Sequence, residues 1–471
     1  MGKYRLPVIL LLGLIIILLV ILLVAEKQEK NKVVPDQNKL GLEVFQKNKA
    51  TYKQINWIGR WENEGNKENF QKDLANNYEF LHQNLIINLT NPSEIGDKPE
   101  DEIITDIIVK MIETSTYSWD IVWINEVIYK NVAARINDLS WGKKYLVNFE
   151  NIPGFKQAHN NFIFNNKSVI AADFNNQIFG PYIEGNYFVL WYNAELTEKI
   201  GIEIKETGMS FNDFLDYIDV IQKYNSKYNT NYAPIYESND KLLMELLFQN
   251  LYLSEIENEI DRSDKLKLQA LRKTLEAFEE LGQKKPLIKS HVKNDWFETR
   301  RMVLDNKAVF YVSGLEMYNH WKSIDEDKAS KMKPVELPVF RENDFVLGYF
   351  YPTWSVLKGS PNEELAVDIL LNISNRETGK YWQNISMNPT GLKTPEIADF
   401  FKNDEISFID KIENKYNYNV YYYPVASYLT GEMNNRTHQL LTTDLREILN
   451  GDKTADEAFN NLLNNLNFQV Q

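Results

Sequence analysis

The chain has 471 residues, with 66 acidic against 52 basic side chains, a formal net charge of −14 and no cysteine. The absence of cysteine excludes a disulfide framework, a thiolate metal site, a cysteine nucleophile and a lipid-modified cysteine. The acidic balance argues against nucleic acid as a partner and against binding to anionic membrane surfaces.

The extreme N-terminus carries an apolar run over residues 6–25, preceded by Lys3 and Arg5. A helix of that length measures about 30 Å, which is enough to cross the hydrocarbon core of a bilayer. Residues 1–25 are therefore predicted to be an uncleaved signal anchor, and the lysine-rich residues 26–50 a polar stalk. The flanking charges favour a single-pass protein of the cell membrane with residues 26–471 on the extracytoplasmic side. Cleavage after Ala25 is the alternative.

The next part of the chain alternates short apolar strands with helical stretches. Strands are expected at 55–59, 85–89 and 119–124, and helices at 67–80 and 100–114. This order predicts an α/β fold with a parallel sheet, in which ligands bind at the carboxyl ends of the strands. Polar and aromatic residues follow two of these strands, namely Trp61 and Glu62 after the first, and Trp123, Asn125 and Glu126 at the third.

The segment 180–202 (GPYIEGNYFVLWYNAELTEKIGI) combines a turn, an aromatic strand at 187–192 and a helix that Asn193 can cap. Large rings on both faces of this strand can form core or line a cleft, and the segment alone favours core.

Farther along, helices are expected at 210–224, 241–253, 265–281, 362–373, 377–385, 434–450 and 454–466. The first begins at Ser210 with Asp213 three residues later, which is a helix-capping pattern. Strands are expected at 308–312, 345–350 and 354–356, with a Ser-Gly break after the first of them. No repeat of 20–50 residues recurs, which excludes a solenoid or propeller.

Seven landmarks occur in one colinear order over roughly residues 53–468. They are WDIVWIN (119–125), the 180–202 segment, the helix at 211–224, LDNKAVFYVSG (304–314), WSVLK (354–358), the 366–382 segment with its Glu-Thr-Gly, and GDKTADEAF (451–459). This order resembles extracellular solute-binding protein family 1, the sugar-type receptors of ABC importers that include maltose-binding protein. The family's usual lipidated cysteine is missing, and the signal anchor would replace it as a tether.

The resemblance implies a periplasmic-binding-protein-like fold of two α/β lobes with a hinge and a central ligand cleft, here preceded by one transmembrane helix. By matching positions, lobe 1 comprises 51–184 plus 350–422, and lobe 2 comprises 187–347 plus 424–470. The chain would cross between lobes near Tyr182–Tyr187, Gly348–Val356 and Tyr422–Val425.

A sugar presents apolar ring faces and many hydroxyls, so an effective site combines aromatic rings with carboxylates and amides. The positions expected to bind ligand are Trp61, Glu62, Trp123, Asn125, Glu126, Tyr182, Asn186, Tyr187, Glu316, Tyr349, Trp354, Asn435 and His438.

Two features depart from the family or leave a choice open. Where members often carry tryptophan after the Gly314 position, this chain has Leu315-Glu316, which favours an amine-bearing or smaller ligand over a stacked sugar. The tyrosine-rich 401–424 region either extends the cleft wall or packs on lobe 1.

The chain has no HExxH, GxSxG, GxxxxGK or GxGxxG motif, and its five histidines are scattered. We therefore expect no enzyme, no catalytic residue, no metal and no cofactor. The expected protein is a monomeric, membrane-anchored substrate-binding component of an ABC importer, with a carbohydrate ligand, a permease partner and no nucleic-acid partner. The alternatives are a tethered sensor or scaffold on the same fold, or a glycoside hydrolase using a carboxylate pair such as Glu62 and Glu126.

Overall fold

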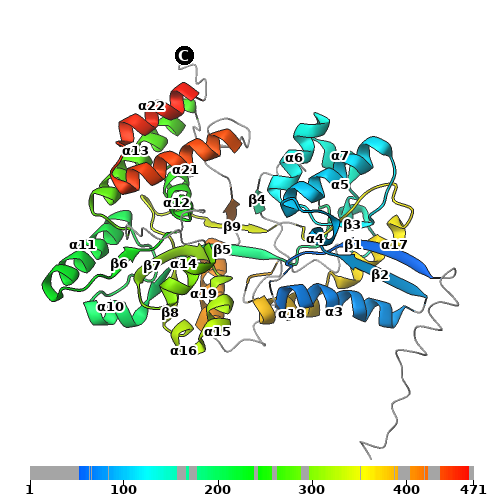
Figure 1. Cartoon of the computed structure of the whole chain (residues 1–471), viewed down its shortest axis with the longest axis horizontal. Helices are drawn as coiled ribbons and strands as arrows, with labels where there is room; N and C mark the ends of the chain where they lie inside the picture. The colour runs from blue at the N-terminus through cyan, green and yellow to red at the C-terminus, as the bar shows by residue number, and fades with distance from the viewer. Residues whose placement is uncertain are drawn as a thin grey trace, which may run out of the picture. The chain divides into compact units, whose positions relative to one another are not determined.

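The computed structural model describes residues 52–62, 64, 66–82, 84–155, 166–168, 178–237, 242–256, 263–287, 296–350, 352–386, 388–390, 404–417, 419–422 and 435–465 (Figure 1). The chain divides into two compact units, of which the smaller comprises Met1–Gln54 with His82–Ile86 and the larger Ile55–Leu81 with Ile87–Gln471. In the smaller unit, the N–H of Lys53 donates to the carbonyl of Asn84 at 2.9 Å. The candidate site lies wholly in the larger unit.

Among the described residues, no helix is both long and apolar enough to cross a bilayer. The predicted anchor at residues 6–25 and the stalk at 26–50 lie outside the described residues.

The first sheet has four strands in the order β10-β3-β1-β2. They are β1 (Lys53–Ile58), β2 (Leu85–Thr90), β3 (Ile121–Val122) and β10 (Ser355–Val356). β1 and β3 run parallel, and β10 joins β3 in the antiparallel direction. The associated helices are α3 (Asn66–Leu81), α4 (Pro92–Ile95), α5 (Glu100–Thr114), α6 (Glu126–Ile136), α7 (Trp141–Tyr145), the 3-10 turn η1 (Phe149–Asn151), α17 (Glu363–Ile373) and α18 (Arg376–Ser386). The predicted alternation of strands and helices is confirmed here.

The second sheet has seven strands, with a main path β4-β11-β9-β5-β7-β6 and β8 paired to β5. They are β4 (Asn166–Ser168), β5 (Gly185–Asn193), β6 (Ala233–Ile235), β7 (Ala308–Gly314), β8 (Met332–Val335), β9 (Val346–Phe350) and β11 (Val420–Tyr422). Its helices are α10 (Ala194–Ile200), α11 (Phe211–Tyr228), α12 (Met244–Ile256), α13 (Asp264–Gln283), α14 (Trp296–Leu304), α15 (Met317–Ile324), α16 (Glu326–Ala329), α19 (Asp404–Tyr416), α21 (Asn435–Asn450) and α22 (Ala455–Asn465).

Strand β5 is the central element of this sheet, because it pairs with β7, β8 and β9. Its rings at 187–192 are buried or half-buried, as the core interpretation of the aromatic run predicts. The Asn193 side chain accepts from the N–H of Leu196 at 3.0 Å, so the predicted cap of the following helix is confirmed.

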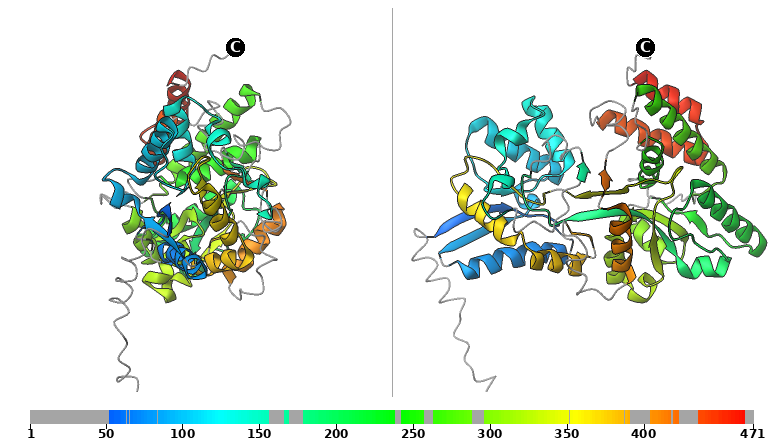
Figure 2. Two further views of the ribbon diagram at one scale, coloured as in Figure 1. Left: turned by 90° about the vertical axis from the view of Figure 1, so that its right-hand side faces the viewer. Right: turned by 180° about the vertical axis from the view of Figure 1, so that it is seen from behind.

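Helices α11, α12, α13, α21 and α22 surround the main hydrophobic core with β5 and β7. Figures 1 and 2 both show α13, α21 and α22 side by side. Helix α11 begins with the predicted reciprocal cap, in which Ser210 and Asp213 bond each other's backbone N–H. It buries the predicted apolar positions 211, 214, 215, 218 and 221.

Two of the three predicted crossing segments lie side by side. Residues 185–187 pair antiparallel with 348–350, and the N–H of Thr353 donates to the carbonyl of Pro181 at 2.9 Å. Of the third segment, Tyr422 ends β11, and residues 423–425 lie outside the described part of the chain. The lobe boundaries themselves stay predictions.

Two features differ from the expectation. Strand β7 continues through Ser313 and Gly314 instead of breaking there, because both pair with β5. Strands β4, β6, β8 and β11 are absent from the prediction, since three or four residues carry too little alternation to be recognised. In the tyrosine-rich region, for which the sequence left two arrangements open, α19 packs against β8 of the second sheet.

Candidate functional site

The candidate site is a groove of 660 Å³ beside the second sheet. This volume falls in the range of pockets that hold a small molecule, about 300–1,000 Å³. Its walls are one face of α21, the start of α12, the end of β7 with the following turn, and the ring of Phe188. Two residues that the sequence predicts to bind ligand, Glu316 and His438, line it.

Helix α21 supplies the longest wall. Residues three, four and seven apart lie on one side of a helix, so its polar positions form a continuous stripe. The lining members are His438, Gln439, Thr442, Thr443, Arg446, Glu447 and Asn450. The opposite side of the helix enters the core through Leu441, Leu445, Ile448 and Leu449. The groove therefore has a row of hydroxyl, amide and charged groups on a helix whose opposite side is buried in the core.

The end of β7 supplies the second wall. Asn186 on β5 is buried, and its Nδ2 donates to Oε2 of Glu316 at 2.7 Å. The N–H of Leu315 donates to Oδ1 of the same amide at 3.1 Å, which determines which end of the amide faces Glu316. Gly314 has no side chain to obstruct this contact, and a Cβ there would lie 1.9 Å from Oε2 of Glu316. Three positions thus hold one carboxylate at the groove.

His438 connects α21 to α12. Its Nδ1 lies 3.0 Å from Oε1 of Glu245. This hydrogen bond raises the pKa of His438, although partial burial acts in the opposite direction. The contact favours the charged imidazolium beside a carboxylate, and both side chains line the groove.

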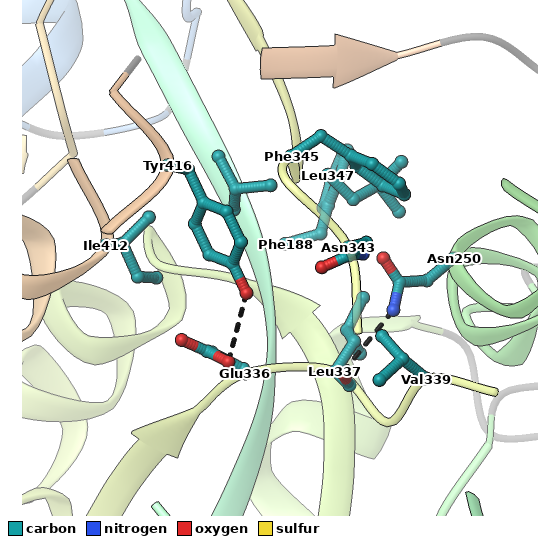
Figure 3. Close-up of a pocket in the computed structure, with 11 residues that line it drawn as sticks. Phe188, Asn250, Glu336, Leu337, Val339, Asn343, Phe345, Leu347, Ile412 and Tyr416 are labelled. Carbon is teal, nitrogen blue, oxygen red and sulfur yellow. Dashed lines mark hydrogen bonds between the residues drawn. The ribbon is translucent and has the colours of Figure 1, made fainter. Parts of the chain in front are cut away.

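A second cavity also has Phe188 in its wall (Figure 3). Its wall includes Tyr416, whose hydroxyl donates to Glu336 at 3.1 Å, and Asn250, whose amide donates to the Leu337 carbonyl at 3.4 Å. The cavity measures 20 Å³, which is room for about one water molecule. It is therefore too small for a saccharide, and the larger groove is the candidate site.

Trp61 and Trp123 lie at the ends of the first sheet's strands, where the sequence places them, but their rings are 5% and 4% exposed. The Trp61 ring packs 4.7 Å from that of Trp382, and Trp123 Nε1 donates to the Gly59 carbonyl at 2.9 Å. The Arg60 guanidinium covers both rings. Burial weighs against these rings as stacking surfaces, and their contact with a ligand stays a prediction.

Glu62 and Asn125 also lie at this end of the first sheet. Glu62 accepts from Ser93 Oγ at 2.5 Å, and Asn125 caps α6 by accepting from the N–H of Ile128 at 2.8 Å. Burial raises the pKa of Glu100 on the neighbouring α5, and the negative charge of Glu62 adds to that effect. Asn125 therefore has a structural task whether or not it meets a ligand.

Four predicted aromatic positions lie along the crossing segments. Tyr182, Tyr187 and Trp354 are no more than 5% exposed, and burial raises the pKa of the Tyr182 hydroxyl. The hydroxyl of Tyr187 donates to Glu413 at 3.0 Å. Tyr349 is half-buried, with its ring 6.0 Å from that of Phe188.

The remaining two predicted positions are described by backbone alone. Glu126 begins α6 and Asn435 begins α21, and both side chains lie outside the description. The structure therefore brings Glu316 and His438 to the groove and bonds Asn186 to Glu316. The other predicted residues lie at the first sheet, the crossings or helix starts.

The sequence prediction did not name Glu245, Thr442, Arg446 or Glu447, which line the groove. The polar positions of α21, spaced four residues apart from 438 to 450, are a signal that could have found two of them, Thr442 and Arg446. Glu245 lies in the first turn of α12, a helix that is buried on almost every side, so only the tertiary contact reveals it.

Two sheets, with helices and antiparallel crossings between β5 and β9, form a periplasmic-binding-protein-like α/β fold. The chain shares this fold with a Bacillus subtilis binding protein, MsmE, in an open conformation, at a TM-score of 0.66 and 14% identity over 89% of this chain and 98% of that one. Maltose-bound MalE3 of T. maritima is similar at a TM-score of 0.62 and 13% identity, over 88% of this chain and 100% of that chain. A sugar transporter of Bacillus licheniformis in complex with stachyose is similar at a TM-score of 0.60 and 15% identity, over 88% and 99% of the two chains. No protein-family model and no curated sequence matches the chain.

Proposed function

We propose that the chain is the substrate-binding component of an ABC importer and binds a carbohydrate in the groove between α12, α21 and the end of β7. The single observation that carries the proposal is the 660 Å³ groove lined by oriented polar groups, on a fold shared with proteins solved with maltose and stachyose. Hydroxyl-rich ligands need such fixed donors and acceptors, and Thr442, Thr443 and Gln439 supply them from one helix face.

The proposal includes closure of two lobes. Residues of the first sheet that are predicted to bind ligand do not line the groove in this structure, so they can contact the same ligand only if the lobes move together. Trp61, Glu62 and Trp123 would then reach the ligand only after a movement about the crossings at 185–187 and 348–350. The protein carries out no chemistry, and its closed form delivers the ligand to a permease.

The apolar residues 6–25 support membrane anchoring, with the bulk of the chain on the extracytoplasmic side. Such a tether keeps a monomeric receptor near its permease without a lipidated cysteine. A tethered sensor on the same fold remains the second candidate, and co-purification from membranes of a permease or of a sensor kinase separates the two.

The test is a thermal-shift and calorimetric screen of the purified full-length chain against mono- and oligosaccharides. A detergent without a sugar headgroup is required, because a maltoside would itself compete for the groove. A ligand at 100 times its Kd stabilises the folded state by about 2.7 kcal/mol. Stabilisation without turnover supports the proposal, whereas hydrolysis of the saccharide, or no stabilisation by any saccharide, contradicts it.

A further inference from the structure

Glu316 is the carboxylate in the groove with the most constrained position. It lies directly after β7, where the absent side chain of Gly314 leaves room for it. Its Oε2 accepts from the buried Asn186 amide, which is itself held by the backbone of Leu315. Asn186 is buried and bonded through both ends of its amide, so the carboxylate is oriented before any ligand arrives.

The other two carboxylates of the groove already have cations. Glu245 lies 3.0 Å from Nδ1 of His438, and Glu447 lies 2.5 Å from Nζ of Lys453. Glu316, by contrast, forms no ion pair within the part of the chain that the structure describes. Arg300, a buried residue of α14, interacts with Glu316 electrostatically: burial lowers the pKa of Arg300, and the negative charge of Glu316 raises it.

Before any closure brings Trp61 and Trp123 to the ligand, the groove itself has little surface for stacking a neutral sugar. Phe188 is the aromatic residue among the described lining residues, and the remaining lining is aliphatic, hydroxyl, amide or charged. A hydrogen bond with one ionised partner is already about twice as strong as a neutral one, so a hydroxyl bonded to Glu316 would gain this too. An ammonium adds the attraction between two opposite charges. An ammonium group would therefore gain more from Glu316 than a hydroxyl would.

We propose that Glu316, held by Asn186, binds a protonated amine of the ligand, so that the groove takes an amino-bearing saccharide in preference to a neutral one. This inference rests on the proposed function, since it specifies the ligand class of the same groove. The amine would donate to the Glu316 carboxylate oxygens, and the α21 stripe would bond the hydroxyls of the same molecule.

The test compares three trisaccharides of β-1,4-linked sugars: glucosamine trimer with free amines, its fully N-acetylated form, and cellotriose. Each is titrated calorimetrically into the full-length chain in a detergent without a sugar headgroup. The measurements are made at about pH 6, below the usual pKa of an amine and above that of a carboxyl group. The free-amine trimer is expected to bind at least about tenfold more tightly than the other two, equivalent to about 1.4 kcal/mol.

The diagnostic variant is Glu316→Gln, which keeps a carbonyl acceptor for Asn186 and removes the charge. It is expected to abolish the amine preference while leaving cellotriose affinity within about twofold. The matched control is Glu326→Gln, which removes a carboxylate outside the groove lining that bonds Lys322 and should leave the preference unchanged.

Equal affinities of wild-type protein for the three trimers would overturn the inference and leave the proposed function standing. The same conclusion follows if Glu316→Gln lowers the affinity for all three trisaccharides equally. The carboxylate would then bind hydroxyl groups, which all three share. Absence of binding by all three, and by every saccharide of the wider screen, would overturn the proposed function and this inference with it.

Discussion

Arg60 and Glu184 form a buried ion pair, with 2.5 Å between Nη2 of Arg60 and Oε2 of Glu184. Arg60 follows β1 of the first sheet, and Glu184 immediately precedes β5 of the second. Nη1 of Arg60 also donates to the Thr353 carbonyl at 3.3 Å, and Oγ1 of Thr353 accepts from the N–H of Glu184 at 3.1 Å. The pair therefore joins the end of one sheet to both segments that lead into the other.

Arg60→Met is expected to destabilise the protein by about 3–5 kcal/mol, because it leaves the Glu184 carboxylate buried without its partner. The free energy of unfolding in urea measures this loss. The double variant Arg60→Met with Glu184→Leu should recover most of it, since no charge then remains buried. A single variant as stable as wild type would show that the pair contributes little.

Gly314→Ala is expected to weaken ligand binding by about tenfold or more and to cost about 1–3 kcal/mol of stability. The added Cβ would lie 2.2 Å from Nδ2 of Asn186, so the amide that holds Glu316 must move. Calorimetric titration and urea unfolding measure the two effects. Gly96→Ala is the control, because the nearest atom to its Cβ would be 3.8 Å away. If Gly314→Ala binds the ligand as tightly as the wild-type protein does, the end of β7 is not part of the binding site.

The His438–Glu245 contact predicts a stability difference that disappears at high pH. Its hydrogen bond raises the folded-state pKa of His438 above the usual value of about 6.5. The stabilisation is therefore complete below about pH 6.5 and is lost as the pH rises through the raised pKa. Comparing the Tm of wild type and His438→Gln across pH should show the larger gap in acid. A gap that does not change with pH contradicts the charged pair.

His320 on α15 predicts the opposite dependence. Burial, reinforced by the positive charges of Arg300 and Lys67, lowers its pKa to about 4. Between this value and about 6.5 the unfolded chain binds the proton and the folded chain does not, so stability falls as the pH drops through that window. The urea concentration at the midpoint of unfolding should fall less between pH 7 and pH 5 in His320→Gln than in the wild-type protein. If it falls equally in both, groups other than His320 cause the acid destabilisation.

Trp61→Ala is expected to cost about 3–5 kcal/mol through loss of buried packing. The Trp61 ring lies 5.6 Å from Trp354 and 6.3 Å from Phe70, in addition to its contact with Trp382. Urea unfolding measures the cost, and Trp61→Phe, which retains a ring, should restore part of it. A variant that is stable but loses ligand affinity would instead place this ring in the closed binding site.

The local elements of this fold were predictable because their signals are contiguous in sequence. The aromatic run of β5, the Asn193 cap and the Ser210–Asp213 cap each depend on residues within five positions of one another. Short strands such as β8 were not predictable, since Met332–Val335 contains a proline and becomes a strand through its pairing with β5.

The candidate site was predictable only in part, and for a similar reason. Glu316 and His438 could be named from their positions in the chain. The bond between Asn186 and Glu316 joins residues 130 positions apart, and the partner of His438 lies on α12. Trp61 and Trp354 could be named as aromatic, whereas their burial depends on the return of α18 and β10 to the first sheet.

The sequence by itself determined the α/β class, most element positions and the colinear order that resembles the solute-binding receptors, because periodicity and capping act over short distances. Tertiary structure alone decided which polar groups share the groove, which rings are buried and which carboxylates already have a cation. These properties depend on contacts between residues far apart in the chain, and no local pattern encodes them.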